Sequence, residues 1–452
     1  MAMARVFNHW FSTQKVSLFG LELTALLGSA LLGEVLLAGE NAIHTRAAFA
    51  LALGFTGLVQ AALYAVDLYK LDVAQRDRET GARLLRAGGI ALALVAPVLA
   101  LLLHGVPRGS TLGAAAGAVF GAVAVRYALR MVLGHPSRVL IVGSGPRAQE
   151  LARSIQNDGE GTCELLGFID DGDPEGLSSN VLRGDVAEVA ARLRADAVVV
   201  ASGDPRRSLP SDALLRCRLQ GRNVLEGARF AERVLRRLPV NQLRQSDLIY
   251  AEELRPSRVR GFVKRALDLV SAGTLAILAA PVMLAVAAAV KLDSKGPLFY
   301  SQERVGLGGK VFQITKFRTM RVDAEAAGAQ WAQKNDPRVT RVGKWLRLCR
   351  LDELPQLFSV LRGDMTLVGP RPERPVFVSQ LKEAIPFYGL REAVKPGVTG
   401  WAQIRYPYGA SVEDARNKLE YDLYYIKNGS AFLDITILFH TVRHVLLGRG
   451  AR

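Results

Sequence analysis

The stretch ALDLVSAGTLAILAAPVMLAVAAAVKL, residues 266–292, decides how this chain is arranged around a membrane. A helix needs about 20 apolar residues to cross the hydrocarbon core, and this stretch is longer than that. Basic residues flank it on both sides, at Arg258, Arg260, Lys264 and Arg265 and again at Lys291, Lys295, Arg304 and Lys310. A straight span would carry one cluster across, against the bias that keeps basic residues on the cytoplasmic side. Because Pro281 also favours a bend, we expect a re-entrant helix at about 266–291, and an ordinary fifth span is the alternative.

Four further apolar segments precede this helix, at residues 16–39, 47–68, 87–104 and 111–133. The connection between the second and third carries Lys70, Arg76, Arg78, Arg83 and Arg86, whereas the two other connections carry only Arg46 and Arg108. This alternation follows the positive-inside rule with both ends of the block in the cytoplasm. We therefore expect a four-helix transmembrane domain over residues 1–135, and a soluble helical bundle is the alternative.

Residues 136–256 have the pattern of a soluble α/β module. RVLIVGSGPRAQELARSI, residues 138–155, predicts a buried strand, a glycine turn and a helix, and residues 165–171 and 195–204 predict two more strands. Gly143 and Gly145 are candidate nucleotide-binding residues, and Asp170 or Asp171 would meet a ribose. A lone glycine motif fits a nucleotide-sensing module and a degenerate scaffold equally well. We expect a Rossmann-like parallel sheet in either case.

Composition limits the classes of protein and of partner. A chain of 452 residues is too long for one core, and half of its residues are hydrophobic although its formal charge is +16. This combination indicates a membrane protein with basic cytoplasmic surfaces, or a partner that carries phosphates. Nucleic acid is the alternative partner and is not expected, because no zinc-finger spacing, basic heptad region or aromatic RNA-binding run is present. The three cysteines have no metal or redox spacing.

Two adjacent acids, Asp352 and Glu353, stand out in RLDELPQLFSVLRGDMTLVGPRPERP, residues 350–375. Neighbouring helical residues point about 100° apart, so one carboxylate could attack phosphorus while the other binds a metal ion. In the alternative, Asp352 caps a helix whose first turn contains Glu353 and Pro355. Five cations could bind a diphosphate, or could face anionic headgroups: Lys316, Arg318, Arg347, Arg362 and Arg371.

Several motifs together resemble the bacterial sugar transferase family, which consists of monotopic phosphoglycosyl transferases. They are KFRTM at residues 316–320, DPRVTRVGKWLR at 336–347, LDELPQLFSVLRGDMTLVGPRP at 351–372, KPGVTGWAQI at 395–404 and EYDLYY at 420–425. The resemblance covers about residues 258–452. The four apolar segments and the Rossmann-like module are similar in architecture to the long members of the family.

The resemblance implies a reaction and roles for individual residues. A nucleoside diphosphate sugar gives its sugar-1-phosphate to a polyprenyl phosphate and releases the nucleoside monophosphate in a ping-pong reaction with a covalent intermediate. Asp352 resembles the nucleophile, and Glu353, with Asp352, the site for Mg²⁺. The positions that bind substrate phosphates are matched by Lys316, Arg318, Arg347 and Arg371, with Asp422 as a further acidic residue of the site.

The expected fold is therefore membrane α plus α/β. It comprises a four-helix transmembrane bundle (1–135), a Rossmann-like parallel-sheet module (136–256) and a catalytic domain, α with minor β, that carries the re-entrant helix (257–452). The expected location is the bacterial inner membrane, with the active site on the cytoplasmic face.

The expected partners follow from the same resemblance. They are a UDP-sugar, undecaprenyl phosphate, the lipid bilayer, downstream glycosyltransferases and a second copy of the chain. The sugar is expected to be glucose or galactose, with N-acetylhexosamine open, and the product would start an exopolysaccharide, capsule or O-antigen of lipopolysaccharide. The alternatives are a membrane-anchored, NAD-dependent sugar-nucleotide dehydratase or epimerase, for which a Tyr-x-x-x-Lys pair is lacking after residue 137, and a non-catalytic scaffold for polymer assembly.

Overall fold

The computed structural model divides the chain into two compact units, which are Met1–Ala4 with Trp10–Leu235, and Arg5–His9 with Arg236–Arg452. The structure describes residues 3–6, 9–12, 20–21, 23–29, 31–32, 53–54, 56–57, 60, 136–157, 163–170, 181–201, 210–251, 254, 257–324, 336–406, 409 and 411–446. The expected four-helix transmembrane domain lies for the most part outside these residues. Within them, β1 (Met3–Val6) and β2 (His9–Ser12) form a two-stranded sheet.

The first unit contains a five-stranded parallel sheet in the order β5-β4-β3-β6-β7. Its strands are β3 (Ser137–Val142), β4 (Cys163–Ile169), β5 (Val181–Leu182), β6 (Ala197–Val200) and β7 (Asn223–Glu226). The central strands are buried on both faces, which explains their continuous aliphatic sequences. This sheet confirms the expected parallel-sheet α/β module.

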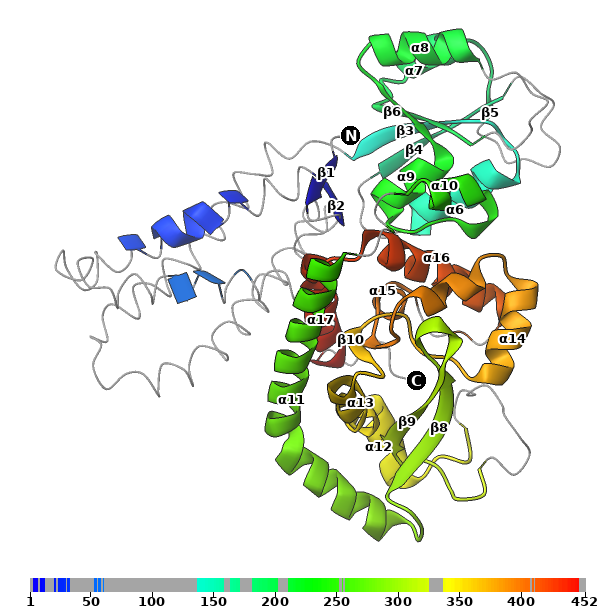
Figure 1. The fold of residues 1–452 in the computed structure, drawn as a ribbon. Helices are drawn as coiled ribbons and strands as arrows, with labels where there is room; N and C mark the ends of the chain where they lie inside the picture. The colour runs from blue at the N-terminus through cyan, green and yellow to red at the C-terminus, as the bar shows by residue number, and fades with distance from the viewer. Residues whose placement is uncertain are drawn as a thin grey trace. The chain divides into compact units, whose positions relative to one another are not determined.

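Helices cover both faces of this sheet (Figure 1). One apolar cluster joins the sheet to α6 (Pro146–Asn157), α9 (Gly227–Phe230) and the π-helix η2 (Ala231–Leu235). A second cluster, on the other face, joins it to α7 (Val186–Arg192) and α8 (Ser211–Leu219). The module therefore has the two cores of a doubly wound fold.

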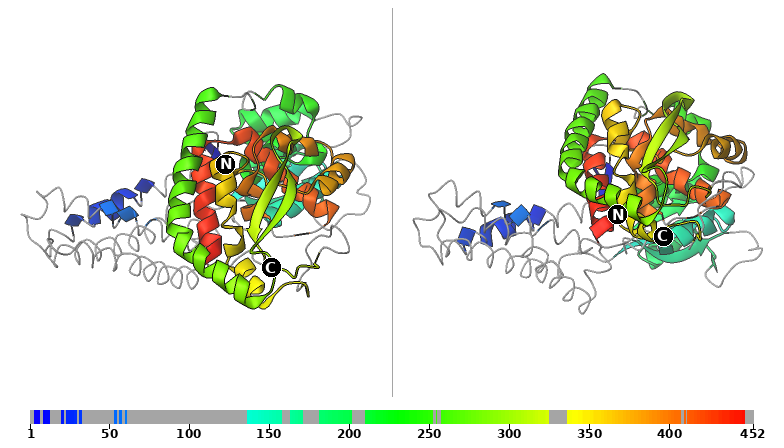
Figure 2. Two further views of the ribbon diagram at one scale, coloured as in Figure 1. Left: turned by 60° about the horizontal axis from the view of Figure 1, so that its bottom comes forward. Right: turned by 90° about the horizontal axis from the view of Figure 1, so that it is seen from below.

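The long helix of the second unit is α11, Arg258–Asp293, which begins where the Ser257 hydroxyl accepts a hydrogen bond from the Arg260 amide. It is the one helix among the described residues that is long and apolar enough to cross a membrane. The helix is bent (Figures 1 and 2), and Pro281 lies inside it. The apolar stretch thus forms one continuous, bent helix.

Both ends of α11 pack on the same unit. Near its start, Arg265 donates hydrogen bonds to the carbonyls of Val360 and Leu361, at 2.7 and 2.8 Å, and Asp268 accepts a hydrogen bond of 2.6 Å from the Thr366 hydroxyl. Near its end, Val286 and Val290 are buried in a cluster with Phe317 and Leu346. Large apolar side chains between these ends are exposed, including Val270, Ile277, Leu278 and Leu284.

The remaining elements form a mostly helical domain with little β structure, as expected. β8 (Phe299–Val305) and β9 (Val311–Phe317) form an antiparallel hairpin around the short helix η5 (Leu307–Gly309), and β10 (Thr366–Val368) pairs in parallel with β11 (Gly397–Thr399). The helices are η3 (Val240–Gln242), α10 (Gln245–Ile249), α12 (Arg341–Leu348), η6 (Leu351–Glu353), α13 (Gln356–Arg362), α14 (Pro375–Ala384), η7 (Tyr388–Ala393), α15 (Trp401–Arg405), α16 (Val412–Asn428) and α17 (Ala431–Leu446).

The second unit begins before the boundary that we expected at residues 256 and 257. Leu238 and Val240 are buried in the same apolar cluster as Leu381, Leu419 and Leu423 of this unit. The segment that precedes α11 is therefore part of the C-terminal core.

Candidate active site

The two adjacent acids lie in η6, a single 3₁₀ turn between α12 and α13. Arg350, directly before this turn, has a positive φ of 56°, which reverses the chain after α12. The N-cap of α13 is Pro355, so Asp352 does not cap a helix as in the alternative considered above. Asp352 is buried inside the domain, and the residue is 8% exposed.

Glu353 accepts hydrogen bonds from two cations that lie far apart in the sequence. Its Oε1 lies 2.7 Å from Arg371 Nη2 and 3.1 Å from Lys316 Nζ, and its side chain is 11% exposed. Burial by itself would raise the pKa of Glu353, but Arg371 and Lys316 together hold that pKa well below its usual range. Glu353 is therefore a fixed negative charge between two cations.

Asp352 is in a different electrostatic position from its neighbour. Burial raises the pKa of Asp352, the negative charge of Glu353 raises it further, and Lys316, Arg347 and Arg371 oppose both effects. Environments that push two carboxylates apart in pKa give them separate chemical roles. Asp352 is therefore the more basic of the two carboxylates, whereas Glu353 is the one that pairs with the cations.

Arg371 projects from a tightly packed backbone corner, Gly369 to Pro372, that follows β10. A Cβ atom on Gly397 would collide with the backbone of Gly369, and one on Gly400 would collide with the Gly369 carbonyl. Only glycine permits two backbones to approach this closely. The contact between the GPRP segment after β10 and the KPGVTG segment at β11 therefore requires glycine at these positions. The contact fixes the backbone from which Arg371 reaches Glu353.

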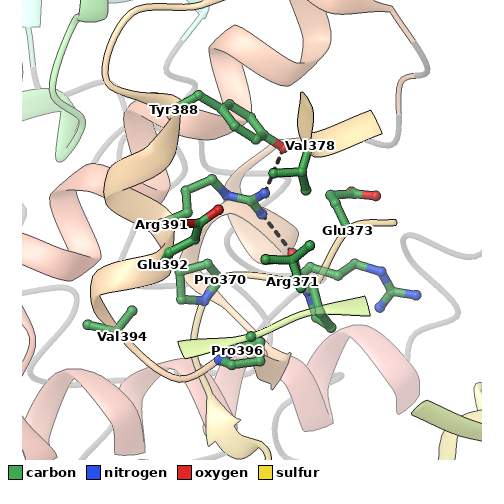
Figure 3. A pocket seen from close by; sticks show the side chains of 12 residues that line it. Pro370, Arg371, Glu373, Val378, Tyr388, Arg391, Glu392, Val394 and Pro396 are labelled. Carbon is green, nitrogen blue, oxygen red and sulfur yellow. Dashed lines mark hydrogen bonds between the residues drawn. The ribbon is translucent and has the colours of Figure 1, made fainter. Parts of the chain in front are cut away.

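Arg391 supports the same corner from the other side. Its Nη2 donates to the Arg371 carbonyl at 2.7 Å, and its Nη1 to the Tyr388 hydroxyl, also at 2.7 Å (Figure 3). Its Nε donates to Asp422 Oδ2 at 2.9 Å. Asp422 therefore acts on the corner through Arg391, and its expected contact with a substrate phosphate remains a prediction. Burial raises the pKa of Asp422, and Arg391 opposes this.

A small, partly open hollow lies beside this corner (Figure 3). Its lining includes Val305, Pro370, Arg371, Glu373, Tyr388 and Glu392. Arg371 thus borders the hollow while its guanidinium pairs with Glu353. The Arg371 side chain therefore connects this hollow with the acid pair.

The other predicted phosphate-binding cations differ in their surroundings. Arg347 Nε donates to the Thr319 hydroxyl at 2.9 Å, which places α12 beside the KFRTM segment, and its charge acts on Asp352. Arg318 is 5% exposed and donates to the carbonyls of Ser294 and Lys295, at 2.8 and 3.0 Å. The structure thus brings Lys316, Arg347 and Arg371 to the acids, whereas the Arg318 guanidinium ties β9 to the end of α11.

The site offers two carboxylates to a metal ion. Among the described residues, no three or more His, Cys, Asp and Glu side chains gather where they could bind one. Mg²⁺ commonly takes only one or two carboxylates and completes its shell with substrate phosphates and water. Glu353 Oε1 is taken by Lys316 and Arg371, whereas Oε2 has Arg350 at 3.9 Å. Asp352 and Glu353 Oε2 therefore fit a magnesium ion that arrives with a diphosphate.

The glycine turn of the first unit has the expected form, but Asp170 beside it already accepts hydrogen bonds from within the protein. Gly143 has a φ of 103°, and its amide donates to the Ile169 carbonyl. The amide and hydroxyl of Ser144 both donate to Asp170 Oδ2. Asp171 lies outside the described residues. Nucleotide binding by Gly143 and Gly145 remains a prediction.

Sequence reasoning did not predict the partners of Arg391 and Glu420. Arg391 lies in the unremarkable segment FYGLREAV, and no spacing marks it as the partner of Asp422. Glu420 lies in the EYDLYY motif. Its ion-pair partner, Arg237, comes before α11 in the chain, and the sequence alone did not predict this contact.

Comparisons with known proteins agree with the geometry. A sequence model described as "Bacterial sugar transferase" matches residues 259–448. The chain is 46% identical over 239 residues to a UDP-N-acetylgalactosamine-undecaprenyl-phosphate N-acetylgalactosaminephosphotransferase of Aeromonas hydrophila, covering 53% of this chain and 56% of that protein. It is 36% identical over 324 residues to an undecaprenyl-phosphate glucose phosphotransferase of Komagataeibacter xylinus, covering 70% and 60%.

A shorter relative matches this chain over most of its own length. The exopolysaccharide production protein PSS of Rhizobium leguminosarum bv. phaseoli is 41% identical over 186 residues, which are 40% of this chain and 93% of that protein. By contrast, the chain spans less than two thirds of the length of the Aeromonas and Komagataeibacter proteins.

Proposed function

Because this chain belongs to the bacterial sugar transferase family, we propose that it transfers a sugar-1-phosphate from a UDP-sugar to undecaprenyl phosphate and releases UMP. The observation that carries this proposal is the acid pair: Asp352 is buried beside Glu353, whose carboxylate binds Lys316 and Arg371. A cationic site with a basic, buried carboxylate suits attack on a diphosphate. No observation favours the dehydratase or the scaffold.

The proposed reaction has two displacements at the same phosphorus. In the first, an Asp352 oxygen attacks the sugar-bearing phosphorus of the UDP-sugar, the bond to the bridging oxygen breaks, and UMP leaves with that oxygen. In the second, a phosphate oxygen of undecaprenyl phosphate attacks the acyl phosphate and frees the carboxylate. The covalent intermediate lets a soluble and a lipid substrate use one site in turn.

The cations have defined tasks in this scheme. Arg371 suits bidentate phosphate binding, and its side chain is 35% exposed although it pairs with Glu353. Lys316 and Arg347 add positive charge around Asp352. A magnesium ion on Asp352 and Glu353 would offset diphosphate charge and stabilise the leaving group.

The position of α11 supports the proposed re-entrant topology. Arg265 and Asp268 at one end, and Val286 and Val290 at the other, pack on the same unit. A helix fixed in this way does not easily place its two ends on opposite sides of a hydrocarbon core about 30 Å thick. We propose that its exposed apolar middle enters the inner membrane and that Asp352 lies at the cytoplasmic face, where undecaprenyl phosphate reaches it.

The sugar is best identified by direct assay. Names of similar proteins include both UDP-N-acetylgalactosamine and glucose as substrates, so the panel comprises UDP-glucose, UDP-galactose and both UDP-N-acetylhexosamines. Each donor carries a labelled β-phosphate, and transfer is scored as labelled undecaprenyl lipid and as UMP, with magnesium or with chelator. We expect one donor to label the lipid and, without lipid, the protein. Asp352→Asn should abolish protein labelling, and label that persists in this variant would exclude Asp352 as nucleophile.

We further propose that this transfer is the first membrane step of exopolysaccharide, capsule or O-antigen synthesis. The printed name of the Rhizobium relative, an exopolysaccharide production protein, supports the polymer class. Its lipid product would pass to downstream glycosyltransferases.

A further inference from the structure

A segment that precedes the family-matched region lies inside the C-terminal core. Residues 236–243, which we call the strap, come before residue 259, where the match to the family begins. Leu238 and Val240 of the strap are each 3% exposed and pack in one cluster with Tyr388 and Leu423. The strap is therefore part of the domain's interior.

Glu420 of α16 binds this strap through its backbone and its side chain. The Glu420 carbonyl accepts the Leu238 amide at 3.0 Å, and Oε1 accepts the Val240 amide at 3.1 Å. Oε2 lies 3.1 Å from Arg237 Nη1. In addition, Trp401 Nε1 donates to the Arg236 carbonyl at 3.0 Å. Both carboxylate oxygens of Glu420 thus meet groups of the strap.

Because Glu420 is buried, loss of these contacts would destabilise the domain. Its side chain is 2% exposed, and a carboxylate removed from water in this way needs a cation and hydrogen-bond donors in compensation. Displacing the strap would leave this charge without Arg237 and the Val240 amide. The position of α16 at this point therefore depends on the strap.

The strap contacts two structures that support the corner carrying Arg371. Glu420 lies two residues before Asp422 on α16, and Asp422 binds Arg391, which donates to the Arg371 carbonyl. Tyr388, which accepts a hydrogen bond from Arg391, belongs to the same apolar cluster as Leu238 and Val240. Both sets of contacts support the backbone segment from which the Arg371 side chain extends to Glu353.

We propose that the strap, bound through Glu420, positions Arg371 for the transfer reaction, so that Arg237 and Glu420 are positioning residues of the active site. The proposal rests on the proposed function, since Arg371 is taken to bind the donor diphosphate. A misplacement of about 1 Å remote from the chemistry can lower a rate by about two orders of magnitude. The effect should therefore be measurable with the fold intact.

The test uses the full chain in membranes or nanodiscs and a double-mutant cycle. Glu420→Gln retains an acceptor for Val240 but loses the charge pair with Arg237, and Asp422→Asn breaks the support of Arg391. The matched control is Asn241→Ala, an exposed residue of the strap. The rate of covalent labelling by the donor, without lipid, is measured for the folded fraction of each variant.

We expect each single variant to lower the labelling rate about tenfold and the double variant to lose no more than the worse single one, because both act through Arg391. Asn241→Ala should stay within about twofold of the parent chain. Losses that multiply in the double variant, or a Glu420→Gln rate equal to the control, would overturn the proposal. If Glu420→Gln does not fold, Arg237→Lys takes its place, because it keeps the charge and loses the planar fork.

A second measurement separates this proposal from the proposed function. If the parent chain transfers no sugar phosphate, the function fails, and amide hydrogen exchange of residues 371–374 and 388–394 then decides the role of the strap. Glu420→Gln should raise exchange there about tenfold over Asn241→Ala, as expected for a supporting contact that opens locally. Equal exchange in the two variants would contradict a positioning role.

Discussion

Glu353→Gln removes the negative charge that lies between Lys316 and Arg371. Glutamine keeps the shape of the side chain and one acceptor oxygen, so the two hydrogen bonds can persist while the ion pairs are lost. We expect this variant to be less stable although it loses no packing, because two partly buried cations then face each other without a counter-charge.

The magnitude follows from the two distances. At an effective dielectric constant of about 20, the attractions at 2.7 and 3.1 Å are ~6 and ~5 kcal/mol. Loss of hydration offsets most of this, and water screens Arg371, whose side chain is 35% exposed. With the hydrogen bonds retained, we expect a net loss of about 2 kcal/mol in the free energy of unfolding. For a unit of this size that lowers Tm by about 4–8 °C.

Thermal unfolding of the full chain, followed by tryptophan fluorescence, measures this loss. The control is Glu413→Gln, which removes a similar ion pair, with Arg416 at 3.1 Å, from a carboxylate that is 65% exposed. An exposed pair contributes little, so its Tm should fall by at most about 2 °C. Equal shifts in the two variants would refute the view that Glu353 organises the cations of the site.

Three more outcomes are expected. Before the donor and its magnesium ion bind, burial and the adjacent negative charge raise the pKa of Asp352, so its carboxylate takes up a proton at a higher pH than a free aspartate does. The kcat/KM of protein labelling reports the pKa values of the free enzyme and should fall as pH drops while still above about 4; an acid limb at or below that value speaks against Asp352 as the nucleophile. Cysteines introduced as Arg258→Cys and Lys295→Cys, after replacement of the native cysteines, should react with an impermeant reagent from the same side of oriented vesicles, and reaction from opposite sides would rule out the re-entrant topology. Gly397→Ala should destabilise the domain by about 3 kcal/mol or more in denaturant unfolding, because the new Cβ meets backbone atoms. Gly261→Ala is the control: open space surrounds it, so the substitution should be neutral or stabilising, and similar values for both variants would contradict the close packing of the corner.

Local patterns in the sequence predicted much of the fold. The aliphatic runs around Gly143 were sufficient for the parallel sheet, because strands buried on both faces need continuous apolar residues. The basic flanks and Pro281 predicted one bent apolar helix, which the structure contains. Motif resemblance brought Asp352, Glu353, Lys316 and Arg371 together, and the ion pairs agree with it.

The contacts that the sequence did not predict join residues far apart in the chain. Arg391 and Asp422 form an ion pair across two helices, and Arg237 pairs with Glu420 over a longer interval. Arg318 shows the converse, since its place in KFRTM suggested a ligand-binding cation, whereas the fold directs its guanidinium to main-chain carbonyls at the end of α11. Charge and spacing identify candidates, but tertiary packing decides which of them meet a ligand.

The attachment of α11 at both ends has a consequence for the lipids in which this protein can work. A helix that crosses a bilayer must match its hydrophobic length to the thickness of the hydrocarbon layer, and it tilts or deforms the lipid when the two differ. In the proposed re-entrant topology, the two ends of this bent helix belong to one domain, so that it meets a single leaflet and has no such length to match. The anchoring of the catalytic domain by α11 should therefore vary little with acyl-chain length, whereas the four spans expected over residues 1–135 would have to match the thickness of the membrane.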